Sequence, residues 1–205
     1  MQIAILTFDG FNELDSLVAP AVLNQLHARG WAAYITAPTA QVTSLHGVVI
    51  ERQRPLGFAS EADAVIVCAS DRMVGIAGNA GLMGEIRLDP ANQLIGAQGS
   101  GALLLAALGF ANGVAICDDD AAAAWAANAG LDRHDGPFHA TSHIATAGGW
   151  YAPLYLTAWI ILRGGARADA EAAIHHVAPP AERDAWVERA ITTVAPFLPP
   201  SGIGA

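Results

Sequence analysis

The chain has 205 residues, of which 53% are apolar and 14% charged, so it is long enough to bury one core and short for two ordinary domains. Its formal charge is −9 and its ten basic residues are scattered singly, which argues against nucleic acid and anionic membranes as partners. A small-molecule ligand fits this composition better.

Residues 1–8 carry no basic segment ahead of their apolar run, so we expect no signal or transit peptide and a cytoplasmic protein. The longest apolar stretch, around residues 150–162, contains Pro153 and is shorter than the roughly 20 residues of a bilayer span. Cys68 and Cys117 are too few for a disulfide framework and are not spaced as metal ligands, so reduced thiols are expected. No metal and no cofactor is predicted.

Strands and helices alternate along the chain, which predicts an α/β fold with a doubly wound, mostly parallel sheet. Strands are predicted at residues 2–8, 31–37, 64–68, 94–98, 114–117 and 144–147, with a pair of short strands in 42–51 that turns near His46-Gly47. Helices are predicted at residues 14–26, 102–108 and 121–129, from Trp150 onward, and as two segments of 169–194 separated by Pro179-Pro180. We expect one domain over residues 1–198 and a flexible tail at 199–205.

A ligand site is expected beyond the carboxyl ends of the strands, where loops and helix N-termini converge in open parallel sheets. Three stretches fall at such ends: Asp9 to Asp15, Cys68 to Arg72, and Gly99 to Ala102.

Three segments, at residues 3–15, 95–106 and 144–149, together resemble successive signatures of the ThiJ/PfpI superfamily, and the branch with isonitrile hydratases is the most similar. The resemblance spans nearly the whole chain in the right order. It implies a flavodoxin-like, class I glutamine amidotransferase-like sandwich, usually a homodimer, with the active site at the turn after residue 98.

In that family the turn carries a nucleophilic cysteine, and the resemblance places this cysteine at Gly99. Glycine has no side chain, so the thiolate mechanism is impossible for this chain as written. The resemblance also places the family's buried acid at Asp15 and its histidine at Asp119. The family's proline-glycine-glycine loop, which helps to position an oxyanion, is replaced by Cys68-Ala69-Ser70-Asp71.

Each of these residues has a plainer structural interpretation. Asp15 either lines the pocket, as a possible acid or base, or stabilises a helix N-terminus. Asp118 to Asp120 is favoured as an N-terminal helix run over a metal site, and Cys68 as a buried structural thiol over a relocated nucleophile. Ser100 lacks the glycine spacing of a serine nucleophile elbow and is expected to cap the helix or touch a ligand. Histidines 134, 139, 143, 175 and 176 are expected to face solvent.

Two functional hypotheses follow. In the first, the domain is non-catalytic and binds a small molecule or a partner at the former nucleophile pocket, through Asp15, Cys68, Ala69, Ser70, Gly99, Ser100, Gly101 and Asp119. In the second, Asp15 activates water in a divergent hydratase or hydrolase. A third possibility is that Gly99 is a deliberate substitution of a natural cysteine. This is less consistent with the second difference from the family pattern, at Asp119. A transcription-factor role has little support, because no helix-turn-helix extension or basic face follows the domain.

Overall fold

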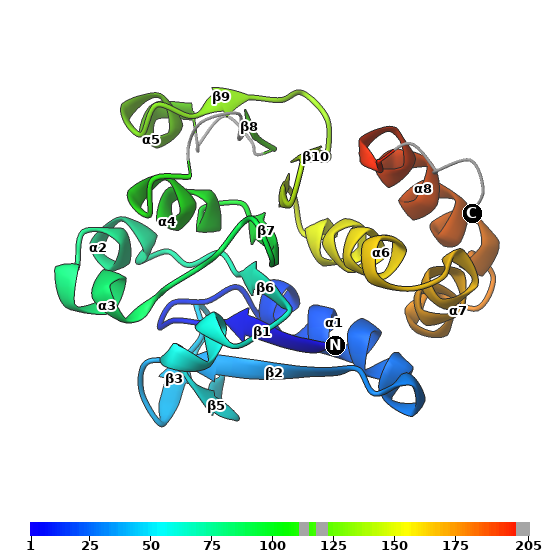
Figure 1. Cartoon of the computed structure of the whole chain (residues 1–205), viewed down its shortest axis with the longest axis horizontal. Helices are drawn as coiled ribbons and strands as arrows, with labels where there is room; N and C mark the ends of the chain where they lie inside the picture. Colours follow the sequence, from blue (N-terminus) through cyan, green and yellow to red (C-terminus); the bar gives the residue numbers. More distant parts are fainter. Residues whose placement is uncertain (111–114, 118–122, 200–205) are drawn as a thin grey trace.

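The computed structural model describes residues 1–110, 115–117 and 123–199, and these form a central sheet with helices on both faces (Figure 1). The strands are β1 Gln2–Leu6, β2 Ala32–Ala37, β3 Gln41–Thr43, β4 Val49–Glu51, β5 Arg54–Pro55, β6 Ala64–Val67, β7 Leu94–Gln98, β8 Ala115–Ile116, β9 Asp132–Arg133, β10 Phe138–Thr141 and β11 Ile144–Ala147. The helices are α1 Glu13–Leu23, α2 Met73–Ala77, α3 Ala80–Glu85, α4 Gly101–Ala107, α5 Ala123–Asn128, α6 Ala152–Gly164, α7 Arg167–Val177 and α8 Arg183–Val194, with 3-10 turns at Asn24–Arg29, Leu56–Ser60 and Ala195–Phe197.

The main sheet has the strand order β10-β11-β7-β6-β1-β2-β5. Every neighbouring pair in it is parallel except β10 and β11, which are antiparallel. This arrangement confirms the predicted mostly parallel, doubly wound α/β sheet. Helices α2, α3 and α4 lie on one side of the sheet, and α1, α6 and α7 lie on the other (Figure 1).

The central strands are buried on both faces, which explains their near-continuous apolar sequences. Ile3 and Ile5 of β1 face the core under α1 and α6, whereas Ala4 and Leu6 face the core under α2 and α4. Helix α6 packs so closely on β7 that a Cβ atom at Gly96 would lie 3.0 Å from Leu156 Cδ2. The sheet therefore lies between two apolar layers. No helix in the described segments is long and apolar enough to cross a bilayer.

Most predicted elements are present, including the short pair β3 and β4 and the two helices flanking Pro179-Pro180. The hydrophobic pattern did not reveal α2, α3, β5, β9 or β10. The strand predicted at 114–117 is present as β8, but it pairs with β9 in a separate small sheet. The predicted tail lies almost wholly outside the described residues, as does Asp119.

The solvent-facing prediction for three histidines is wrong. His134, His139 and His143 are half-buried, and the ring centroids of His134 and His139 lie 5.1 Å apart. Phe197 packs against both rings, with centroid distances of 6.0 and 5.4 Å, because the chain returns over β10 after α8. His175 and His176 are exposed on α7, as predicted.

Candidate functional site

Three loops meet at the carboxyl edge of the sheet, as the sequence predicted. The register aligns Leu6 with Val67 and Val67 with Ala97, so β1, β6 and β7 end side by side. The loops after these strands bond directly to one another: the Asn12 N–H donates to the Ala69 carbonyl oxygen at 3.1 Å. These contacts bring the predicted site residues, apart from Asp119, into one region.

The turn between β7 and α4 is an elbow centred on Gly99. Gly99 has φ 44°, in the left-handed region that favours glycine, and its N–H donates to the Ala147 carbonyl oxygen at 3.0 Å. Helix α4 begins directly behind it, against the end of β6, and a Cβ atom at Gly101 would lie 2.5 Å from the Val67 carbonyl oxygen. The elbow therefore has a tight backbone geometry, but residue 99 contributes no side chain to it.

Ser100 joins the elbow to the neighbouring loop. Its hydroxyl donates to the Ser70 carbonyl oxygen at 2.9 Å and accepts the Ser70 N–H at 3.0 Å. It makes no side-chain capping bond to α4, so the capping role predicted for it is wrong. The Ser70 hydroxyl in turn donates to the Asp9 carbonyl oxygen at 2.7 Å.

Asp15 lies in the first turn of α1 with only 3% of its surface exposed. Its Oδ2 accepts the Ala69 N–H at 3.3 Å. The predicted neighbourhood of Asp15 and the loop after β6 is therefore present. The N–H groups of Ala69 and Ser70 are both engaged, by Asp15 and by Ser100, rather than directed together at one point.

Cys68 is a buried thiol, as favoured from the sequence. It is 1% exposed, and burial, followed by the nearby Asp15 charge, raises the pKa of its thiol to about 12. Cys117 is 2% exposed, and its Sγ lies 3.6 Å from the Thr146 hydroxyl. Neither cysteine forms a disulfide in the described part of the chain, and neither has the exposure of a reactive thiol.

Gln98, the last residue of β7, is a feature that the sequence analysis missed. Its side chain is fully buried, and within the described residues neither its Oε1 nor its Nε2 has a hydrogen-bond partner. Buried amides are ordinarily hydrogen-bonded, so this residue, adjacent to Gly99, is unusual. The only sequence signal is a glutamine at the end of an otherwise apolar strand.

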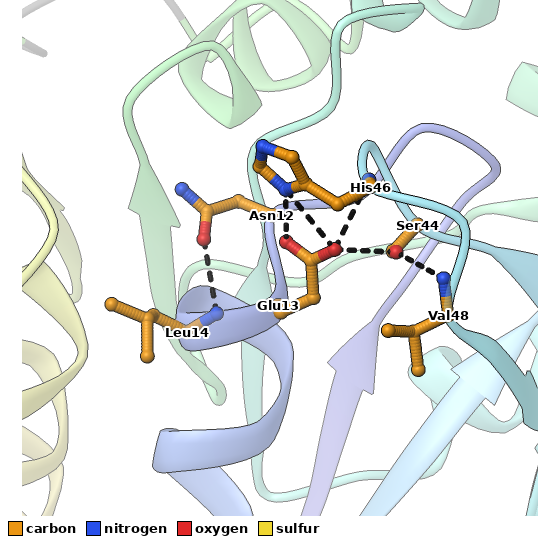
Figure 2. A network of polar contacts seen from close by, with 6 residues as sticks. All are labelled: Asn12, Glu13, Leu14, Ser44, His46 and Val48. Carbon is orange, nitrogen blue, oxygen red and sulfur yellow. Dashed lines mark hydrogen bonds and ion pairs between the residues drawn. The ribbon is translucent and has the colours of Figure 1, made fainter.

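A second missed feature is a polar network between α1 and the β3–β4 hairpin (Figure 2). The Glu13 carboxylate accepts the Ser44 hydroxyl, the His46 N–H at 3.1 Å, and His46 Nδ1, which lies 3.0 Å from Oε2. Hydrogen bonds from Ser44 and His46 lower the pKa of Glu13 to about 2. No sequence motif connects these residues, because the hairpin and the helix meet only in the folded chain.

No group of three or more metal-ligating side chains occurs in the part of the chain that the structure describes. Comparison with protein-family models gave no match, and comparison with curated proteins also gave none.

Solved structures do match. Schizosaccharomyces pombe DJ-1 superposes with a TM-score of 0.71 at 13% identity, covering 88% of this chain and 100% of that one. A DJ-1 superfamily protein from Salmonella typhimurium, solved as a cysteine-to-alanine mutant, gives 0.72 at 22% identity, covering 87% and 98%. A ThiJ/PfpI family protein from Pseudomonas syringae gives 0.70 at 21% identity, covering 95% and 87%. The chain thus has the flavodoxin-like α/β fold of the DJ-1 and ThiJ/PfpI proteins.

Proposed function

We propose that this chain is a ThiJ/PfpI-type domain that binds a small molecule, or a partner, at the elbow without cysteine-dependent catalysis. The carrying observation is Gly99: the backbone is bent at φ 44° where the resemblance places a nucleophile, and the residue there has no side chain.

The remaining thiols do not replace it. Cys68 and Cys117 are both buried, and a pKa of about 12 keeps Cys68 as a neutral thiol at physiological pH. The loop donors also argue against acyl transfer, which needs N–H groups aimed jointly at a developing oxyanion. Here the Ala69 N–H is donated to Asp15 and the Ser70 N–H to Ser100.

The buried amide of Gln98 supports a binding role. A primary amide without partners is costly to bury, and among the described residues neither amide atom of Gln98 has one. Neither atom is exposed, so a polar ligand would provide partners by displacing the residues packed on Gln98.

The second candidate is a hydratase or hydrolase, related to the isonitrile hydratases, in which Asp15 activates water. The burial of Asp15 beside the loop after β6 favours it. A carboxylate in such surroundings is a reasonable general base.

The test is turnover and binding of an isonitrile, methylglyoxal and a chromogenic peptide amide by the unaltered protein, Asp15→Ala and Gly99→Cys in parallel. We expect no turnover by the unaltered protein and saturable binding that shifts the backbone amide resonances of Gly99 and Ser100. Turnover abolished by Asp15→Ala would replace the binding role with the second candidate. Activity only in Gly99→Cys would identify a family-type site that lacks its nucleophile.

A further inference from the structure

Two polar side chains beside the elbow loops, Asn12 and His46, are each anchored at one end, and among the described residues the other end has no hydrogen-bond partner (Figure 2). They come from different elements, the start of α1 and the β3–β4 hairpin, and we call them the rim pair. Neither belongs to the residues discussed above as the elbow.

His46 is oriented by Glu13. The imidazole Nδ1 lies 3.0 and 3.2 Å from the two oxygens of the Glu13 carboxylate, which can only accept, so in the neutral ring Nδ1 carries the proton and donates. The tautomer with Nδ1–H leaves Nε2 as a hydrogen-bond acceptor. Within the described segments Nε2 makes no hydrogen bond, and the His46 side chain is 62% exposed.

Asn12 is oriented by the helix that it caps. Its Oδ1 accepts the Leu14 N–H at 3.0 Å, so the amide nitrogen must point away from α1. In Figure 2 this nitrogen and the His46 ring lie on the same side of the start of α1. The amide nitrogen is a donor without a partner among the residues described.

Backbone bonds tie the rim pair to the site. The Asn12 N–H donates to Ala69, in the loop that Ser100 also holds. The residues that precede Asn12 and His46 are also hydrogen-bonded to each other: the Leu45 N–H donates to the Phe11 carbonyl oxygen at 2.9 Å. The pair therefore lies at the margin of the same group of loops, with its donor and acceptor set by contacts already made.

We propose that the rim pair recognises a carboxamide or hydroxyl of a small molecule bound at the elbow, with His46 Nε2 accepting and Asn12 Nδ2 donating. Such a group both donates and accepts, which matches one fixed acceptor and one fixed donor. Glu13 is the positioning residue, because it sets the His46 tautomer. This inference rests on the proposed binding function and names the chemical class of its ligand.

The test uses the full ¹⁵N-labelled protein at pH 8 with benzamide as probe and acetophenone, which lacks the N–H donor, as control. Two variants each remove one recognition atom and keep the anchor. Asn12→Asp retains the oxygen that caps α1, and His46→Asn retains a donor where Nδ1 meets Glu13. Long-range ¹H–¹⁵N spectra report the His46 tautomer, and titrations report which side chains contact the probe.

We expect the Nδ1–H tautomer, saturable benzamide shifts at His46 and Asn12, and affinity about 5- to 10-fold weaker in each variant and for acetophenone. An Nε2–H tautomer overturns the proposal. Shifts at Gly99 and Ser100 with the same affinity in both variants overturn the rim pair but leave elbow binding intact. Shifts at the pair alone would instead remove the elbow from the proposed function, and no saturable shift anywhere refutes the carboxamide assignment.

Discussion

The Ser100 hydroxyl bonds to both backbone polar groups of Ser70, donating to its carbonyl oxygen at 2.9 Å and accepting its N–H at 3.0 Å. These two hydrogen bonds join the start of α4 to the loop after β6, two segments that are 30 residues apart in sequence. A single hydroxyl thus links the elbow to its neighbouring loop and occupies a donor that an oxyanion would otherwise use.

Ser100→Ala should lower the free energy of unfolding by about 1–2 kcal/mol, because the part-buried Ser70 N–H loses its partner and the Ser70 carbonyl oxygen keeps only the Met73 N–H, at 3.2 Å. Urea denaturation measures it. Ser60→Ala is the matched control, since Ser60 is exposed and makes one bond to its own turn, and it should change stability by less than about 0.5 kcal/mol. Equal effects in the two variants would show that the Ser100 contacts do not stabilise the site.

Gly101→Ala should destabilise the protein by about 1–3 kcal/mol or more, because the added Cβ would lie 2.5 Å from a backbone oxygen that cannot easily move. Gly84→Ala, in α3, provides the contrast. Beyond the backbone of α3 itself and the two chain neighbours, no described atom lies within 4 Å of a Cβ there, so helix propensity should raise stability by about 0.5 kcal/mol. Thermal unfolding of both variants is the measurement, and a Gly101→Ala protein as stable as Gly84→Ala would contradict the close approach of α4 to β6.

Both thiols should resist Ellman's reagent at pH 8 in the folded protein and react fully in denaturant. The reason is burial, which also raises the pKa of Cys68 to about 12 from an ordinary value of 9.0. The folded state therefore retains a proton that the unfolded state loses, and stability should fall as pH rises from about 9 toward 12. Cys68→Ala should reduce this alkaline loss, and rapid labelling of the native protein would contradict the prediction.

The sequence was sufficient for the sheet because the core strands, such as Ile3 to Leu6, are continuous apolar runs bounded by turn residues. The elbow was also predictable, since Gly99 and its flanks follow one such run directly. Helices α2 and α3 were not, because both are short and contain glycine, with weak apolar periodicity.

The missed site features share one cause: they depend on contacts between distant segments. Glu13 and His46 are 33 residues apart, and only the packing of the hairpin on α1 makes them neighbours. The capping alternative predicted for Ser100 was wrong for the same reason, because its partner Ser70 comes from another loop. Helix-capping preference is a local rule, and here a tertiary contact overrides it.

Glu13→Gln should destabilise the protein at pH 7 and have no effect near pH 2. The folded-state pKa of Glu13 is lowered to about 2 from 4.5, so its stabilisation is present above about pH 4.5 and is lost as pH falls through about 2. Urea denaturation at pH 7, 5, 3 and 2 tests this, with Glu188→Gln, an exposed residue of α8, as control. A difference from the unaltered protein that stays constant across this range would show that the ionised form of Glu13 is not what holds the hairpin.

Two buried glutamines provide the sharpest comparison in the chain. Gln93 is fully used: its Nε2 donates to Ala59 and Ala62 at 2.9 and 2.6 Å, and its Oε1 accepts the Asp89 N–H at 2.7 Å. Gln98 is more deeply buried, and its amide has no partner within the described residues. Methionine has nearly the shape of glutamine without its polar atoms. Gln98→Met should therefore raise the free energy of unfolding by about 1–2 kcal/mol, whereas Gln93→Met should lower it by about 2–3 kcal/mol. If Gln98→Met instead destabilises the isolated protein as much as Gln93→Met does, the Gln98 amide is already hydrogen-bonded in solution, and its unpaired state no longer supports a ligand at the elbow.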